Sequence, residues 1–201
     1  MPMNVAILIF PDVEVLDFAG PFEVFSSAVR VARRDLQLKE PSFSVYSVAE
    51  TREPVRARGG LMVIPDRALS DPLTPDVLIV PGGVVTEPLG NPRTIEWLRR
   101  SAASAKLVAS VCTGAFLLGK IGLLDGLSAT THWEDIPDLR SAHPRIDVLE
   151  NRAWVDEGRI VTSGGISAGI DMSLHLIRRL LGADIARATA RQLEYRWRDE
   201  P

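Results

Sequence analysis

The chain has 201 residues, of which 46% are hydrophobic and 24% are charged, and its net charge at pH 7 is −3. We expect a single domain over residues 1–201, because a chain of this length buries about 70% of its unfolded surface and needs no disulfide or metal to fold. The small negative charge gives no electrostatic reason to expect a nucleic acid or an anionic membrane as a partner.

The sequence indicates neither a leader peptide nor a membrane span. Residues 1–4 run directly into a strand-like segment, and no apolar run approaches the about 18 residues that cross a membrane. We therefore expect a cytoplasmic protein whose partner is a small molecule. The single cysteine cannot form an internal disulfide, and the three scattered histidines lack the spacing of a zinc site, so we expect no metal.

Apolar, strand-like runs alternate with helical patterns, which is typical of a mostly parallel sheet covered by helices on both faces. In the first half, the expected order is strand, helix, strand, hairpin, strand and helix. Their ranges are 4–10, 21–34, 43–48, 55–64, 76–80 and 91–103. The pair Gly59-Gly60 supplies the hairpin turn, and a proline-rich connection follows the hairpin.

The second half contains the strand that leads to the only cysteine. We expect this strand over residues 107–111 and a helix from Gly114 onward. A short helix over 132–140, hairpin strands over 153–156 and 159–162, and helices over 167–181 and 184–196 complete the order. The whole pattern predicts a three-layer α/β sandwich around a mostly parallel central sheet.

Cys112 lies where the strand over 107–111 gives way to a helix, which is the position of a nucleophile at a strand-to-helix elbow. Ser110 and Gly114 flank it and are small enough for the chain to reverse direction there. The N–H groups at the start of the helix favour a thiolate, and we expect them to lower the cysteine pKa into the range of about 3.5–7.5. The alternative is a buried core cysteine without a chemical role.

Asp17 follows the first strand and lies between two apolar residues, Leu16 and Phe18. Apolar neighbours raise the pKa of a carboxyl, so Asp17 is a candidate proton donor to chemistry at the Cys112 sulfur. The alternative is that Asp17 only caps the helix that follows it.

Glycines and one histidine complete the candidate site. Gly82 and Gly83 follow the strand over 76–80, and their backbone N–H groups, with that of Gly114, can approach a developing negative charge. A tight turn alone would also explain the Gly82-Gly83 pair. His132 follows Cys112 by 20 residues and can orient or protonate the reacting groups, although packing beside Trp133 at a helix start explains it equally well.

Five motifs in this order resemble the DJ-1/PfpI superfamily, whose fold is a flavodoxin-like three-layer sandwich with a cysteine at a nucleophile elbow. The motifs are Leu-Asp-Phe-Ala-Gly-Pro around Asp17, Pro-Gly-Gly ending at Gly83, Ser-Val-Cys-Thr-Gly around Cys112, Thr-Thr-His-Trp around His132, and Gly-Gly-Ile-Ser-Ala-Gly-Ile-Asp ending at Asp171. The resemblance spans nearly the whole chain. Within the superfamily it is strongest to the isonitrile hydratase branch, which the amidase-like domains of AraC-type regulators share.

This resemblance implies a mechanism without a cofactor, in which Asp17, Cys112 and Thr113 are the functional residues. The Cys112 thiolate adds to an isonitrile carbon while Asp17 supplies the proton, and water then converts the thioimidate to an N-substituted formamide. Thr113 would hold the substrate nitrogen or the attacking water, or it is only a residue at the helix start. The resemblance also implies a homodimer that pairs near the active site.

Three other activities are compatible with parts of this pattern. A glyoxalase III-like enzyme would use Cys112 and His132 on an α-oxoaldehyde. A glutamine amidotransferase needs a late His-x-Glu pair, whereas His175 stands in Leu-His-Leu-Ile, so we exclude that activity. An effector-binding domain of the AraC-type kind would sense a small molecule without chemistry. Because such regulators carry a helix-turn-helix module after this domain and the chain ends at residue 201, we expect a stand-alone enzyme.

Overall fold

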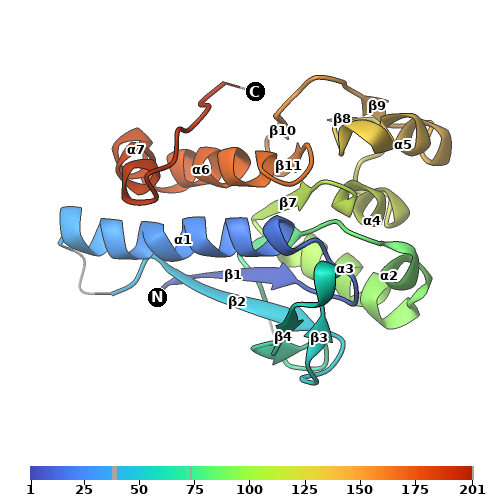
Figure 1. The fold of residues 1–201 in the computed structure, drawn as a ribbon, viewed down its shortest axis with the longest axis horizontal. Helices are drawn as coiled ribbons and strands as arrows, with labels where there is room; N and C mark the ends of the chain where they lie inside the picture. Colours follow the sequence, from blue (N-terminus) through green and yellow to red (C-terminus); the bar gives the residue numbers. More distant parts are fainter. Residues whose placement is uncertain (38–39, 73, 201) are drawn as a thin grey trace.

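The computed structural model describes residues 1–37, 40–72 and 74–200, and a seven-stranded sheet runs through its middle (Figure 1). The strand order is β10-β11-β7-β6-β1-β2-β5, and every neighbouring pair is parallel except β10 with β11. The strands of this sheet are β1 (Met3–Leu8), β2 (Phe43–Ala49), β5 (Arg67–Ala68), β6 (Val77–Val80), β7 (Leu107–Val111), β10 (Trp154–Glu157) and β11 (Ile160–Ser163). The predicted three-layer α/β sandwich with a mostly parallel sheet is confirmed.

Helices cover both faces of this sheet. Helices α1, α6 and α7 pack against one another on one face (Figure 1). Helices α3 and α4 cover the other face, because the connections from β6 to β7 and from β7 to β11 run along the sheet in the opposite direction to the connection from β1 to β2. The helices are α1 (Val15–Asp35), α2 (Thr86–Gly90), α3 (Pro92–Ser104), α4 (Gly114–Lys120), α5 (Ile136–Ala142), α6 (Ala168–Leu181) and α7 (Ala183–Gln192), with short 3₁₀ turns η1 (Arg58–Gly60) and η2 (Trp133–Asp135). None of the helices in the described ranges is long and apolar enough to cross a membrane.

The central strands are apolar because both of their faces are covered. Every residue of β6 and of β7 is buried. The direction of the crossovers reverses between β1 and β6, since β2 lies on one side of β1 and β6 on the other. Ligands of open α/β sheets bind beyond the carboxyl ends of the strands at such a reversal. The segments that follow β1, β6 and β7, which carry the candidate residues, therefore converge there.

Most predicted elements are confirmed, and the hairpins are among them. Strand β3 (Val55–Arg56) pairs antiparallel with β4 (Met62–Val63), and β10 pairs antiparallel with β11. Four short elements were not predicted: α2, the edge strand β5 in the proline-rich connection, and the parallel pair β8 (Ser128–Ala129) and β9 (Asp147–Val148). Strands of two residues are too short to show an alternating pattern.

The first helix begins at Val15 and not at residue 21 as predicted. Pro21 indicated a helix start, but it lies inside α1, where buried residues at positions 18, 21, 25, 28 and 32 form one continuous apolar face. The last helix ends at Gln192 and not at residue 196, because the following tail turns back and the Trp197 side-chain N–H donates to the Asp171 carbonyl oxygen.

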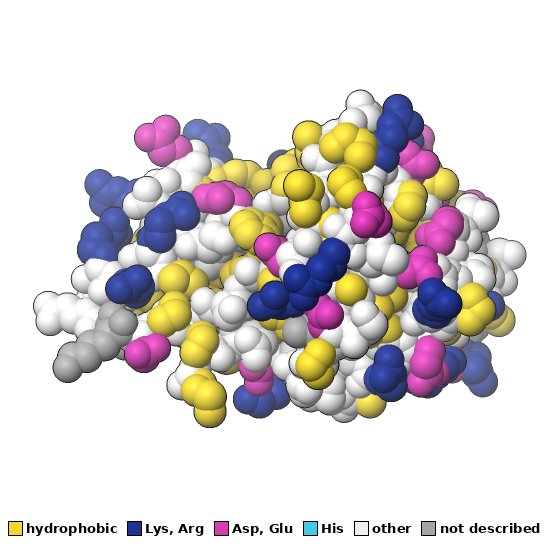
Figure 2. Space-filling model, turned by 90° about the horizontal axis from the view of Figure 1, so that it is seen from below, with side chains coloured by type: hydrophobic (Ala, Val, Ile, Leu, Met, Phe, Trp, Pro, Cys, Tyr) yellow, Lys and Arg dark blue, Asp and Glu magenta, His cyan; other side chains and the backbone are white. Residues whose placement is uncertain are grey.

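On the face shown in Figure 2, acidic and basic side chains are interspersed and do not gather into a large area of one sign. This arrangement agrees with the small net charge of −3.

Candidate active site

Cys112 occupies a tight elbow between β7 and α4. Its φ is 57°, in the left-handed region that residues other than glycine rarely adopt. The Cys112 N–H donates to the carbonyl oxygens of Ser163 and Gly164, both at 3.2 Å, and these bonds anchor the unusual backbone to the end of β11. The predicted elbow is confirmed, and the strain at the cysteine is typical of a functional position.

Glycines let three chain segments meet at this elbow. A Cβ atom at Gly114 would overlap the Val80 carbonyl oxygen at the end of β6. A Cβ atom at Gly82 would lie 2.5 Å from the Thr113 backbone nitrogen and 2.9 Å from the Cys112 Cβ. No side chain fits in either place, so both glycines are required for the backbone of the 80–83 segment to lie against the start of α4.

We expect Gly114→Ala to lower the free energy of unfolding by about 3 kcal/mol or more, because the added methyl group would have to displace a backbone carbonyl in a packed interior. Gly90→Ala is the matched control, since nothing lies within 4 Å of a Cβ atom at that position in α2. Urea unfolding of the two variants beside the wild type measures the difference. Equal stability of the two variants would show that the backbone at the elbow shifts to fit the methyl group without a loss of stability.

Asp17 lies in the first turn of α1 and is fully buried. Its Oδ2 accepts a hydrogen bond from the Gly82 N–H at 3.1 Å, while Oδ1 has no hydrogen-bond partner among the described residues. Burial raises the pKa of Asp17 to about 7, and the Gly82 N–H and the neighbouring Cys112 thiol oppose this rise. The predicted rise in pKa is confirmed. The capping alternative is wrong, because Glu14 occupies the N-cap of α1.

Burial also raises the pKa of Cys112, to about 12, and the charge of Asp17 is the second cause. The prediction that the helix start lowers this pKa is therefore wrong. The Thr113 N–H does act in that direction, but α4 has only seven residues, Cys112 is only 7% exposed, and the charge of Asp17 acts on the thiol. The resting cysteine is therefore a thiol, and the Asp17 carboxyl lies beside it.

The raised pKa of Asp17 makes the free energy of unfolding depend on pH, and the folded protein loses stability as this carboxyl ionises. The pKa of this carboxyl is 3.8 when unperturbed and about 7 in the folded protein, so the stability that its protonated form provides is complete below about pH 4 and is lost as the pH rises to about 7. At about 1.4 kcal/mol for each tenfold change in proton affinity, the full loss is about 4 kcal/mol.

We therefore expect Asp17→Asn to become progressively more stable than the wild type between pH 4 and pH 8, by up to about 4 kcal/mol. Urea unfolding at pH 4, 6 and 8 measures this change. Asp184→Asn, at an exposed position of α7, is the control and should show no such gain. A gain in the stability of Asp17→Asn that does not depend on pH would contradict the raised pKa of Asp17.

The backbone N–H groups of Gly82 and Gly83 are both occupied by side chains. The Gly82 N–H donates to Asp17, and the Gly83 N–H donates to the Thr113 Oγ1 at 2.9 Å. The Thr113 hydroxyl in turn donates to the Gly83 carbonyl oxygen at 2.9 Å. The expectation that these two N–H groups meet a charge on the substrate is therefore corrected, because they hold Asp17 and Thr113 in place. The N–H that faces the sulfur belongs to Thr113.

His132 reaches the same place from another part of the chain. It lines a pocket of about 210 Å³ together with Cys112 and Thr113. Its Nδ1 lies 3.4 Å from the Asp135 Oδ2 and accepts a hydrogen bond from the Glu134 N–H at 3.4 Å. The packing explanation is confirmed, because His132 starts the 3₁₀ turn η2 beside Trp133. A part in the chemistry stays a prediction, which the shared pocket with Cys112 allows.

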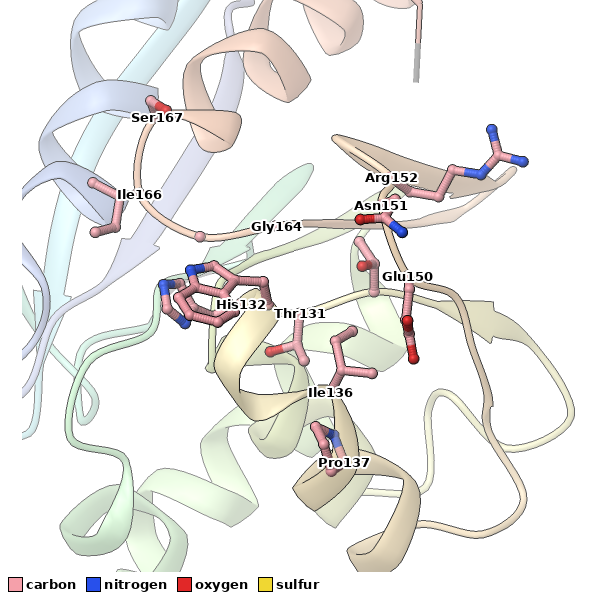
Figure 3. Close-up of a pocket in the computed structure, with 13 residues that line it drawn as sticks. Thr131, His132, Ile136, Pro137, Glu150, Asn151, Arg152, Gly164, Ile166 and Ser167 are labelled. Atoms are coloured by element: carbon pink, nitrogen blue, oxygen red, sulfur yellow. The ribbon is translucent and has the colours of Figure 1, made fainter.

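The pocket around Cys112 adjoins a larger one of about 580 Å³ (Figure 3). His132 and Ile166 line both pockets, and Figure 3 shows them on opposite loops that precede η2 and α6. Sequence reasoning missed Arg58, Asp135 and Ile166 as pocket residues. Asp135 and Ile166 lie within or next to the motifs around His132 and Asp171, which was the available indication. In the described residues, no group of three or more His, Cys, Asp or Glu could hold a metal ion.

The fold and the elbow define a class of protein: α/β sandwiches that carry a cysteine between a central strand and a helix. Residues 3–179 match the DJ-1/PfpI family, and the chain belongs to this family. It is 37% identical over 198 residues to an isonitrile hydratase from Pseudomonas putida, a match that covers 97% of this chain and 79% of that protein.

Two further comparisons show the breadth of the family. A solved ThiJ/PfpI family protein from Pseudomonas syringae is 28% identical and superposes with a TM-score of 0.84, covering 100% of this chain and 78% of that one. The transcriptional regulator GbdR from Pseudomonas aeruginosa, of the helix-turn-helix type, is 28% identical over 96% of this chain. The chain spans about half the length of that regulator, 51%.

Proposed function

We propose that this protein is an isonitrile hydratase, which adds water to R–N≡C and releases the N-substituted formamide R–NH–CHO. The observation that carries this proposal is the buried Asp17 carboxyl, with a pKa of about 7, beside the Cys112 thiol at the elbow. The 37% identity to the Pseudomonas putida isonitrile hydratase supports it. No cofactor takes part in the proposed reaction.

In the first step, Asp17 takes the thiol proton as the Cys112 sulfur bonds to the isonitrile carbon, and it then delivers this proton to the same carbon. The product is a thioimidate, Cys112–S–CH=N–R. The Cys112 sulfur and its former proton are now both bonded to the isonitrile carbon, and Asp17 is again a carboxylate. The unpartnered Oδ1 of Asp17 is the atom that is free to carry this proton.

In the second step, water adds to the thioimidate carbon, and Asp17 takes one proton from the water and passes it to the nitrogen, which gives the tetrahedral Cys112–S–CH(OH)–NH–R. Asp17 then takes the hydroxyl proton as the C–S bond breaks and returns it to the sulfur, which releases the formamide and restores the thiol and the carboxylate. The small pocket, of about 210 Å³, would hold the isonitrile carbon against the Cys112 sulfur during both steps.

Thr113 serves this mechanism as a positioning residue. Its hydroxyl exchanges two hydrogen bonds with the Gly83 backbone and so fixes the loop beside Asp17. We expect Thr113→Ala to lower kcat by about tenfold or more, because each lost hydrogen bond weakens this placement by about 1 kcal/mol. Thr113→Ser keeps the hydroxyl and should restore most of the rate, whereas equal losses in the two variants would assign the effect to packing of the methyl group.

We further propose that the enzyme is a cytoplasmic homodimer that pairs near the active site and acts on small molecules. The apolar side chains of Val84, Trp133 and Ile166 support the pairing, because they are 46%, 75% and 40% exposed next to the pocket residues. Exposed apolar groups clustered around a site are typical of an interface. The molecular mass in solution tests this arrangement.

A substrate panel tests the proposed function. Cyclohexyl isocyanide and methylglyoxal are each incubated with the wild type and with Cys112→Ala, and the formamide and the hydroxy acid are measured. Formamide from the wild type alone supports the hydratase, and turnover of methylglyoxal alone would replace it by a glyoxalase III-like activity. The second candidate function is an effector-binding domain, which the similarity to GbdR over 96% of this chain favours. Tight binding of either compound without its turnover would identify this function.

A further inference from the structure

Acidic side chains outnumber basic ones in the lining of the pocket around Cys112. Glu14 comes from the N-cap of α1, and Glu134 and Asp135 come from the 3₁₀ turn η2. Arg58 is the one Lys or Arg that lines this pocket in the described part of the chain, and its guanidinium pairs with Glu14 at 3.4 Å. The lining therefore carries a net negative charge whether or not His132 holds a proton.

The two acidic groups of η2 share a single neighbouring base. The Nδ1 of His132 lies 3.4 Å from the Asp135 carboxylate and 3.7 Å from the Glu134 carboxylate. Asp135 is close enough to the cysteine that its charge contributes to the raised pKa of Cys112. Asp135 and Cys112 also line the same pocket, so this negative charge lies close to the sulfur.

A buried group points to a ligand in the same place. The Asp17 carboxyl is fully buried behind Cys112, and its Oδ1 lacks a hydrogen-bond partner among the residues described. This carboxyl neighbours the Cys112 thiol from behind and does not itself line the pocket. A negative charge on a substrate that reacts at the sulfur would be repelled by Glu134 and Asp135, which line the pocket and whose side chains are partly open to solvent.

We propose that the Cys112 pocket selects isonitriles whose substituent is positively charged, such as an ammonium group, and rejects anionic ones, with Asp135 and Glu134 as specificity-determining residues. The part of this proposal that concerns isonitriles rests on the proposed function. The part that concerns charge does not, because it applies to any reagent that approaches the sulfur.

Thiol labelling tests the charge preference without catalysis, because the chain has a single cysteine. A cationic 2-aminoethyl and an anionic 2-sulfonatoethyl methanethiosulfonate are compared at pH 8 and low salt. In each case the sulfur of Cys112 forms a disulfide with the reagent and methanesulfinate leaves. The ratio of the two rates is divided by the same ratio for 2-mercaptoethanol, which removes the intrinsic difference in reactivity.

We expect this normalised ratio to exceed tenfold in the wild type and to fall at least threefold in Asp135→Asn. Glu96→Gln, which removes one exposed negative charge from α3, is the control and should leave the ratio unchanged. In 1 M KCl, where the screening length is about 3 Å, the wild-type ratio should approach one. A ratio near one at low salt, a ratio unmoved by Asp135→Asn, or no labelling by either reagent would overturn the proposal.

Isonitriles of equal length that carry an ammonium, a hydroxyl or a carboxylate group test the substrate preference. We expect kcat/KM to decrease in that order, and the difference between the first and last to shrink in the Glu134→Gln, Asp135→Asn double variant. Charge-selective labelling without hydration of any isonitrile would remove the proposed function and leave the charge preference standing. Hydration of all three at equal kcat/KM would support the proposed function and remove the charge preference.

Discussion

Cys112→Ala should abolish formamide production from an isonitrile, because no S–C bond can form and the water reaction then lacks its intermediate. The variant should remain folded, since alanine keeps the Cβ atom and the buried site loses only a thiol. Formamide is measured by chromatography at equal protein concentrations. We expect a loss of at least about 10⁴-fold, the scale on which removal of a nucleophile acts.

Two controls separate chemistry from folding in this experiment. Thermal unfolding shows whether Cys112→Ala keeps the wild-type structure. Intact-mass measurement of the wild type during turnover should detect the thioimidate as an adduct of one isonitrile on the single cysteine. Two results would remove Cys112 from the mechanism. One is formamide production by the alanine variant, and the other is unchanged turnover by the wild type after a thiol-blocking reagent has modified Cys112.

The elbow could be predicted from the sequence because its causes are local. An apolar run, a cysteine and small residues at Ser110 and Gly114 fix a strand, a turn and a helix within a few positions. The start of α1 could not be placed in this way. A proline usually marks the first turn of a helix, and only the packing of α1 on the sheet shows that its apolar face continues through Pro21.

The thiol pKa was predicted with the wrong sign because its main causes are not local. The helix start is visible in the sequence next to Cys112, but desolvation and the charge of Asp17 arise only when β1 and β7 bring distant segments together. The same holds for Gly82 and Gly83. Their sequence indicates close approach of a backbone, and only the fold shows that Asp17 and Thr113 are the groups that approach.

Asp17→Asn should lower kcat/KM for an isonitrile by about 10²–10⁴-fold, the usual contribution of a general acid–base group. Asparagine has the same shape and can keep the hydrogen bond from the Gly82 N–H, but it cannot take the thiol proton or return it to the isonitrile carbon. The loss therefore measures proton transfer and not a change in the shape of the pocket.

The pH dependence of the two proteins distinguishes this role from a structural one. In the wild type, the carboxyl must be ionised to accept the proton of the neutral thiol, so kcat/KM should rise as the pH increases through about 7 and then level off well below the cysteine pKa of about 12. In Asp17→Asn this rise should be absent, since the group that titrates has been removed. Asp184→Asn, exposed on α7, should keep the wild-type profile. A rise near pH 7 that persists in Asp17→Asn would assign the titration to another group, with His132 as the next residue to replace.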